Sequence, residues 1–191
     1  MGSATAPAGA KSRLIALLRE RSFERRRVVL ASGRESDFFI DCKQAVLSAE
    51  GHALVGEVLF DALDDLPACD AIAGVELGGC PLASAVSLVS YQRGRPLPAL
   101  YVRKQAKDHG SRRLVEGGGT LAPGARIVLL EDVVTTGGSS LRAVEALRQT
   151  GVEVVGIAAL VDRLEGGAEA IREAGLSLWA LSNRRDYLGD E

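Results

Sequence analysis

The segment IVLLEDVVTTGGSS, residues 127–140, combines a buried strand pattern with a polar, glycine-rich end. It opens with four apolar residues, continues with the acidic pair Glu131 and Asp132, and ends in threonines, glycines and serines. A short apolar run of this kind is typical of a strand that is buried on both faces. Ligands of open parallel sheets bind beyond the carboxyl ends of the strands, so the acidic pair predicts a binding site. As solvated loop acids alone, the two carboxylates would repel each other without a partner.

The residues after the acidic pair have the composition of an anion site. Residues 135–139 are small, so their backbone can approach a ligand closely, and they precede a helix with the apolar face Leu141, Val144 and Leu147. Ser139 is also compatible with a plain helix N-cap. The Walker pattern GxxxxGK[ST] does not occur. Carboxylates that accept hydrogen bonds from vicinal hydroxyls, followed by a phosphate cradle, predict a site for a ribose 5-phosphate.

Composition narrows the class of protein. The chain has 191 residues, 47% of them hydrophobic, and a formal net charge of -2, which favours one globular domain and gives no basic excess for wrapping nucleic acid. No apolar run approaches the ~20 residues of a membrane span, and the N-terminus has no signal pattern, so we expect no membrane partner and a cytoplasmic protein. Cys42, Cys69 and Cys80 lack C-x-x-C spacing, so we expect them to be reduced and mostly buried.

The order of patterns along the chain predicts an α/β fold. Residues 1–10 read as a disordered tail and residues 11–191 as a single domain. We expect a helix from Lys11 to near Ser22, two short strands within residues 28–41 and a helix over 49–63. Strands at 71–76, 97–102, 125–130, 152–161 and 176–181 then alternate with helices at 81–91, 139–149 and 168–173. This pattern predicts a central, mainly parallel sheet flanked by helices.

The stretch at 127–140 resembles the motif for 5-phosphoribosyl 1-diphosphate (PRPP) of the type I phosphoribosyltransferases, and VVTTGGS is similar to its orotate phosphoribosyltransferase version. The resemblance implies the fold of that family, with a small N-terminal hood of strands and helix, residues 11–45, over the base site. It implies that Glu131 and Asp132 hold the ribose hydroxyls and that Thr135 also lies against the base. The 5-phosphate loop would consist of Val133, Val134, Thr135, Thr136, Gly137, Gly138 and Ser139.

GVELGGCPLA, residues 74–83, resembles the family's diphosphate loop. The resemblance implies that the backbone of Glu76, Leu77 and Gly78 binds the diphosphate. Some relatives have a lysine at the position of Gly78. The same glycines would also suit a plain turn from a strand to a helix.

VRKQAKDHG, residues 102–110, resembles the family's catalytic loop and implies that Arg103, Lys104, Lys107, Asp108 and His109 enter the site. A charge run by itself is more often a solvated surface. Here several cations would stabilise the negative charge that develops on a departing diphosphate. The resemblance also implies that the loop serves the neighbouring subunit, and therefore a homodimer.

SGRESDFFIDCKQ, residues 32–44, resembles the family's N-terminal signature. There Phe39 would stack on the pyrimidine, whereas Phe38 fits an ordinary core position at least as well. Many relatives have a lysine at Ala31 that reaches PRPP, a contact for which Lys43 or Arg34 are the candidates here. ALVDRLEGG places Arg163 where the family has an arginine that pairs with the carboxylate of orotate.

Taken together, these motifs predict transfer of a phosphoribosyl group from PRPP to orotate, which yields orotidine 5-monophosphate and diphosphate in UMP synthesis. Lys107, His109 and Arg103 would draw out the diphosphate, Asp132 would fix the sugar, and Mg²⁺ would be carried in on PRPP. Two alternatives remain open. A phosphoribosyltransferase for a purine or uracil would share the motif at 131–139 but is not expected to combine KDHG with Arg163. A non-enzymatic regulator would lose the loop cations, which are present here.

Overall fold

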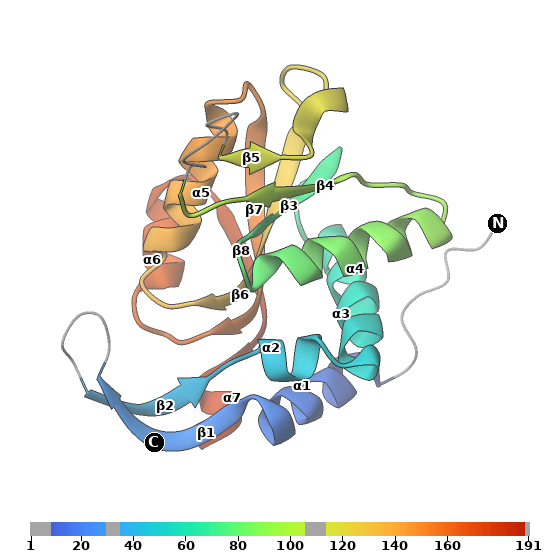
Figure 1. Cartoon of the computed structure of the whole chain (residues 1–191). Helices are drawn as coiled ribbons and strands as arrows, with labels where there is room; N and C mark the ends of the chain where they lie inside the picture. Colours follow the sequence, from blue (N-terminus) through green and yellow to red (C-terminus); the bar gives the residue numbers. More distant parts are fainter. Residues whose placement is uncertain (1–8, 30–34, 106–113, 190–191) are drawn as a thin grey trace.

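The computed structural model describes residues 9–29, 35–105 and 114–189, and its centre is a six-stranded sheet in the order β5-β4-β3-β6-β7-β8 (Figure 1). Neighbouring strands are parallel except for β5, which is antiparallel to β4. The strands are β3 (Ala71–Val75), β4 (Ala99–Val102), β5 (Val115–Glu116), β6 (Arg126–Val134), β7 (Glu153–Asp162) and β8 (Ser177–Asn183). This arrangement confirms the predicted α/β fold with a mainly parallel sheet.

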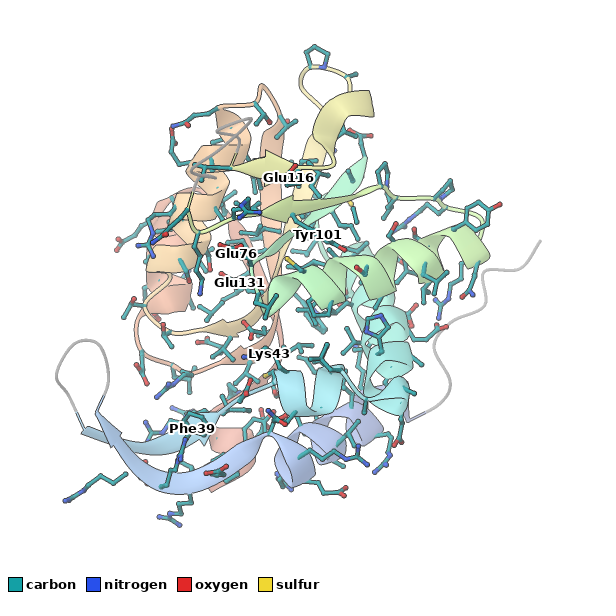
Figure 2. All side chains as sticks on the ribbon, in the orientation of Figure 1. Phe39, Lys43, Glu76, Tyr101, Glu116 and Glu131 are labelled. Atoms are coloured by element: carbon teal, nitrogen blue, oxygen red, sulfur yellow. The ribbon has the colours of Figure 1, made fainter. Side chains whose placement is uncertain are left out.

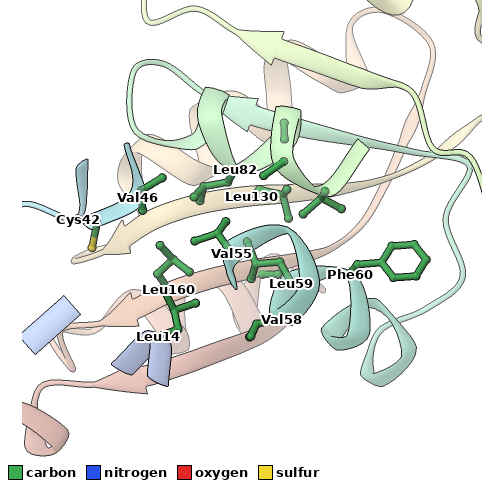
Figure 3. Close-up of a cluster of buried hydrophobic side chains, with 14 of the residues drawn as sticks. Leu14, Cys42, Val46, Val55, Val58, Leu59, Phe60, Leu82, Leu130 and Leu160 are labelled. Carbon is green, nitrogen blue, oxygen red and sulfur yellow. The ribbon is translucent and has the colours of Figure 1, made fainter. Parts of the chain in front are cut away.

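Helices cover both faces of the sheet and fix its middle strand. Helices α3 (Ala49–Ala62) and α4 (Gly79–Gln92) cover one face, and α5 (Gly138–Arg148) and α6 (Gly167–Glu173) cover the other. Because side chains of a strand alternate between faces, Val128 and Leu130 of β6 pack with α3 and α4, while Ile127 and Leu129 pack with α5. Figure 3 shows Leu130 among side chains of α3 and α4. The strand that leads to the acidic pair is therefore held on both sides.

The hood, residues 11–45, forms a separate layer beside the sheet, at the bottom of Figure 1. It contains most of α1 (Ala10–Arg21), the antiparallel pair β1 (Phe23–Val29) and β2 (Glu35–Ile40), and the start of α2 (Lys43–Val46). Phe38 is fully buried, with its ring centroid 5.2 Å from that of Phe23 and 5.7 Å from that of Tyr187 in the C-terminal helix α7 (Arg185–Leu188). Phe38 is thus a core residue, which leaves Phe39 as the candidate for contact with a base.

Several boundaries differ from the predicted ones. β6 runs to Val134 rather than ending at Leu130, because β7 pairs with it as far as Val134 and Asp162. β3 pairs with β6 only up to Gly74 and Leu130, so the acidic pair lies on an overhang of β6 beyond β3. β1 begins at Phe23 instead of Val28, and β5, α2, α7 and the short helices η1 (Leu63–Asp65) and η2 (Gly118–Thr120) were not predicted.

The remaining predictions concern the N-terminal tail, the cysteines and membrane-spanning helices. Ala10, expected to end the tail, begins α1 and is buried, whereas residues 1–8 lie outside the described part. The three cysteines are free, as predicted, but only Cys42 is fully buried. In the described ranges of the chain, none of the helices has the length and apolar character needed to cross a membrane.

Candidate active site

Glu131 is the more deeply buried member of the acidic pair, with 4% of its surface exposed. The hydroxyl of Ser140 donates to its Oε1 atom at 2.8 Å and that of Ser139 at 3.4 Å. Burial raises the pKa of Glu131 to about 7, although these hydrogen bonds oppose the shift. Sequence reasoning missed Ser140, the third residue of α5, which gave no separate signal. A buried carboxylate with two hydroxyl donors on one oxygen keeps its other oxygen available for a ligand hydroxyl.

Asp132 lies against the loop after β3. Its Oδ1 atom accepts a hydrogen bond from the backbone N–H of Val133 at 3.0 Å. A Cβ atom on Gly78 would overlap the Asp132 carboxylate, so the absence of a side chain at position 78 is what lets the two loops meet. A lysine at this position, as in some relatives, does not fit this placement of Asp132. Gly78 and Asp132, both expected in the site, thus lie next to each other, and the neighbouring Glu76–Leu77 peptide is cis.

The expected phosphate loop, residues 133–139, starts within β6. Val133 and Val134 belong to β6, and their side chains pack against the hydrophobic core. The connection from β6 to α5 consists of residues 135–137, and Gly137 has a φ of 80°, a conformation that favours glycine. α5 begins at Gly138, so its first backbone N–H groups have no acceptor within the helix and face the loop. Residues 135–139 are therefore the candidate anion site, and Val133 and Val134 lead into it from β6.

The segment after β4, which begins with Arg103 and Lys104, also approaches the acidic pair. Arg103 continues the pairing of β4 with β5 because its N–H donates to the Leu114 carbonyl at 2.8 Å. A cleft of about 320 Å³ is lined by Arg103, Lys104 and Ser139, among others. The positive charge of Lys104 opposes the rise in the pKa of Glu131, which burial causes. Lys107, Asp108 and His109 lie outside the described residues.

Arg163 follows β7 and lies where the sheet meets the hood. Only 9% of its surface is exposed, and its Nη2 atom donates to the Phe38 carbonyl at 3.2 Å and lies 2.9 Å from Glu165 Oε1. The ring of Phe39 carries the guanidinium of Arg26 at 3.8 Å from its centroid. Glu165 and Arg26 were not predicted as site residues. The acid two residues after the arginine in DRLE was the available signal for Glu165.

The backbone joins these parts into one site. The N–H of Arg163 donates to the carbonyl of Val134 at 2.9 Å, so the arginine is fixed to the strand that carries the acidic pair. Figure 2 shows Glu76 and Glu131 near the carboxyl end of the sheet and Phe39 on the hood. The site combines the carboxylates of Glu131 and Asp132, the candidate anion site at residues 135–139, the cations Arg103 and Lys104, and an arginine next to an aromatic ring. Together these groups suit a sugar phosphate with an attached planar acid. A mainly parallel sheet with such a site at its carboxyl end is typical of enzymes that bind and transfer phosphoribosyl groups.

Comparisons with known proteins agree with this class. The pattern of the phosphoribosyl transferase domain matches residues 53–173. The orotate phosphoribosyltransferase of Sorangium cellulosum is 71% identical over 97% of this chain and 96% of its own length. The Mycobacterium tuberculosis orotate phosphoribosyltransferase in complex with PRPP has a TM-score of 0.75 at 35% identity, covering 93% of this chain and 98% of that one. The chain belongs to the phosphoribosyltransferase family, and within it to the orotate phosphoribosyltransferases.

The fold alone does not determine which nucleobase the enzyme accepts as a substrate. The adenine phosphoribosyltransferase of Leishmania donovani has a TM-score of 0.62 at 19% identity, covering 91% of this chain and 80% of that one. Since that likeness concerns the fold only, the choice of orotate depends on the site residues and on the relatives of higher identity.

Proposed function

We propose that this chain transfers the 5-phosphoribosyl group of PRPP to orotate, giving orotidine 5-monophosphate and diphosphate in the synthesis of UMP. The observation that carries the proposal is the overhang of β6, where Glu131 and Asp132 stand beside a glycine-rich turn and the start of α5. These parts are spaced for the hydroxyls and the 5-phosphate of one ribose. The Sorangium relative, at 71% identity, supports orotate as the acceptor.

The roles of the site residues follow from charge. Glu131 and Asp132 accept hydrogen bonds from the ribose hydroxyls, each worth about 1.5 to 3 kcal/mol to a charged group. Residues 135–139 bind the 5-phosphate through backbone N–H groups and hydroxyls. The backbone of Glu76, Leu77 and Gly78 binds the diphosphate, and Arg103 and Lys104 add positive charge to it. Lys107 and His109 keep the same role as a prediction from the sequence.

The reaction breaks the bond between the anomeric carbon and the diphosphate and forms one to a ring nitrogen of orotate. Negative charge develops on the leaving diphosphate and positive charge on the ribosyl centre. Cations from the segment after β4 stabilise the first, and the buried carboxylates stabilise the second. The ring nitrogen loses its proton as the new bond forms, and the departing diphosphate can accept that proton, so a strong general base from the protein is not required.

Mg²⁺ enters as part of the PRPP substrate and neutralises the diphosphate. Among the residues that the structure describes, no cluster of three or more histidine, cysteine, aspartate or glutamate side chains could hold a metal ion. We expect the metal to be bound mainly by oxygens of the substrate, which suits the preference of Mg²⁺ for phosphate oxygens and water.

Arg163 and Phe39 make the base end of the site. The fork of Arg163 can donate two parallel hydrogen bonds to the orotate carboxylate, and its burial strengthens that interaction. Phe39, with Arg26 on its ring, offers an aromatic surface to the pyrimidine.

A homodimer would complete the site. Leu77 is 67% exposed next to the expected diphosphate loop, and Leu88 and Tyr91 of α4 are exposed at 56% and 74%. Leu77 beside the site and the exposed apolar residues farther along α4 suit an interface with a second copy that presents its catalytic loop across it. Mixing the inactive variants Lys107→Ala and Asp132→Asn tests this: shared sites regain activity in mixed dimers, and no regain would count against a shared loop.

The activity is tested by supplying PRPP and Mg²⁺ with orotate, uracil or adenine in turn. We expect loss of orotate absorbance, a product with the mass of orotidine 5-monophosphate and an equal amount of diphosphate. Uracil and adenine should give at least about a hundredfold lower kcat/KM, because neither has a carboxylate for Arg163. Preferential use of uracil or adenine, or binding of PRPP without turnover, would contradict the proposal in favour of the two alternatives.

A further inference from the structure

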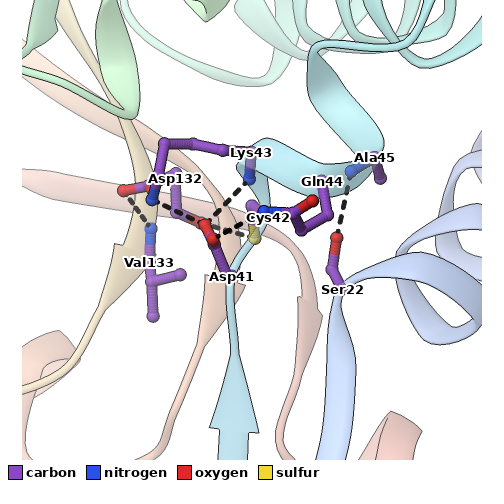
Figure 4. A network of polar contacts seen from close by, with 8 residues as sticks. All are labelled: Ser22, Asp41, Cys42, Lys43, Gln44, Ala45, Asp132 and Val133. Carbon is purple, nitrogen blue, oxygen red and sulfur yellow. Dashed lines mark hydrogen bonds and ion pairs between the residues drawn. The ribbon is translucent and has the colours of Figure 1, made fainter.

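The hood reaches the acidic pair through the start of α2. Cys42, the residue before this helix, places its Sγ atom 3.8 Å from the backbone carbonyl of Asp132. Lys43, the first helical residue, lies 2.6 Å from Asp41 through its Nζ atom. Figure 4 shows the side chain of Lys43 extended from α2 to the place where Asp41 and Asp132 face each other. A residue of the hood thus meets the carboxylate expected to hold the ribose.

The local structure holds Lys43 in this position. The carboxylate of Asp41 accepts hydrogen bonds from the backbone N–H of Lys43 at 3.2 Å and from the Gln44 side chain at 3.2 Å. The N–H of Ala45 donates to the Ser22 hydroxyl at 3.3 Å, which ties α2 to the end of α1. A lysine held at both its backbone and its Nζ atom loses less conformational entropy when it pairs with a second carboxylate.

The electrostatics of Asp132 depend on groups from two elements. Asp41, Cys42 and Lys43 face it from the hood, and Glu131 is its neighbour on β6. Burial raises the pKa of Asp132, the Lys43 charge lowers it, and Asp41 raises it further. The hydrogen bond with Asp41, together with attraction to both aspartates, raises the pKa of Lys43, so this lysine stays charged.

The charges of two different lysines therefore act on the two carboxylates of the acidic pair. Lys104, from the segment after β4, acts on Glu131, and Lys43, from the hood, acts on Asp132. Because the Lys43 ammonium lies between two carboxylates, its position suits it to fixing Asp132 rather than to replacing the lysine that relatives carry at Ala31.

We propose that Lys43 is a positioning residue, which holds the Asp132 carboxylate charged and in place for the ribose hydroxyls of PRPP and so couples the hood to sugar binding. This inference rests on the proposed function for the identity of the sugar. It does not depend on orotate as the acceptor, because it concerns binding of the ribose alone.

The test is calorimetric binding of PRPP with Mg²⁺, at pH 6 and pH 8.5, to the parent, Lys43→Met and Lys43→Arg. Lys43→Met should weaken binding about tenfold at pH 6 and clearly less at pH 8.5, because without the lysine Asp132 holds its proton to higher pH. Lys43→Arg should stay within about threefold of the parent at both values, since it keeps the charge. Ratios to the parent at each pH cancel the titration of PRPP itself.

Two further variants separate this role from a purely structural one. Lys11→Met removes a lysine that lies over Trp179, far from the acidic pair, and should bind like the parent. Asp41→Asn keeps an oxygen that can accept the Lys43 N–H and removes a charge that raises the pKa of Asp132, so its binding at pH 6 should fall clearly less than that of Lys43→Met. An equal loss at both pH values in Lys43→Met, or a loss in Asp41→Asn as large as in Lys43→Met, would overturn the inference.

The same binding data separate this inference from the proposed function. If the parent binds PRPP with the expected pattern among the variants but does not consume orotate, the proposed function fails and the role of Lys43 stands. If orotate is consumed and Lys43→Met binds PRPP like the parent at pH 6, the role of Lys43 fails and the function stands.

Discussion

The Oε1 atom of Glu76 lies 2.6 Å from the backbone nitrogen of Lys104 and accepts its hydrogen bond. Glu76 follows β3 and Lys104 follows β4, so one carboxylate joins the expected diphosphate loop to the segment that brings positive charge. The backbone of Lys104 is thereby fixed where the chain leaves the sheet, on the side of Glu131.

Removing the acceptor should loosen this junction. We expect Glu76→Ala to lower kcat/KM for PRPP about tenfold, because a hydrogen bond to a charged group is worth ~1.5 to 3 kcal/mol. Glu76→Gln keeps an acceptor oxygen and should lose less. Steady-state kinetics measure both, with Glu153→Gln at the exposed start of β7 as the control. Parental kinetics in Glu76→Ala would show that the junction plays no part in catalysis.

A side chain at position 78 should displace the carboxylate of Asp132. The Cβ atom of Gly78→Ala would overlap the Asp132 carboxylate and push it from its place, so the KM for PRPP should rise by about tenfold or more. Gly119→Ala is the matched control, because a Cβ atom there meets open space. Similar kinetics for the two alanine variants would mean that the position of Asp132 is not needed for PRPP binding.

The stability of the fold should depend on the protonation of Glu131. Its pKa is raised from 4.5 to about 7, so its favourable contribution is complete below pH 4.5 and is lost as the pH rises through about 7. Glu131→Gln removes the cost of the buried charge and should stabilise the protein at pH 8 by up to about 3 kcal/mol. At pH 4.5 the two proteins should differ much less.

Thermal unfolding of both proteins across this pH range measures the effect, with Glu153→Gln again as the exposed control. The same substitution should strongly reduce turnover, since a neutral amide binds the ribose hydroxyls less well. A difference in stability that does not change with pH would contradict the raised pKa.

Arg163 should determine the affinity for the base. Arg163→Leu should raise the KM for orotate by about a hundredfold and that for PRPP by much less, because a buried two-pronged contact to a carboxylate is lost. Arg126→Leu, at the opposite end of β6, serves as the control. Kinetics with each substrate varied in turn provide the test, and equal increases in both KM values would refute the assignment.

The apolar strands and the acidic pair were predictable because they depend on local pattern. Continuous burial of β3, β6 and β7 follows from their apolar runs, and the family motifs around Asp132 and Arg163 are contiguous in the sequence. The extension of β6 to Val134 was not predictable, since it depends on pairing with β7 rather than on the residues of β6 themselves.

Contacts between segments that are distant in the sequence were also not predictable. Tyr187, in a C-terminal part that gave no signal, packs its ring 5.5 Å from Phe23 and supports the hood. The bond between Glu76 and Lys104, and the approach of Lys43 to Asp132, join residues from different elements. Only the fold places such groups together, because neither partner has a local pattern that indicates the other.

The acidic pair is expected to bind the ribose of PRPP. Calorimetric titration of PRPP with Mg²⁺ into the parent and into Asp132→Asn tests this role without depending on turnover. We expect one binding site per chain in the parent and an affinity about tenfold or more lower in the variant, because the charged acceptor for the sugar hydroxyls is gone. No binding heat in the parent, or equal affinity in both proteins, would contradict this role.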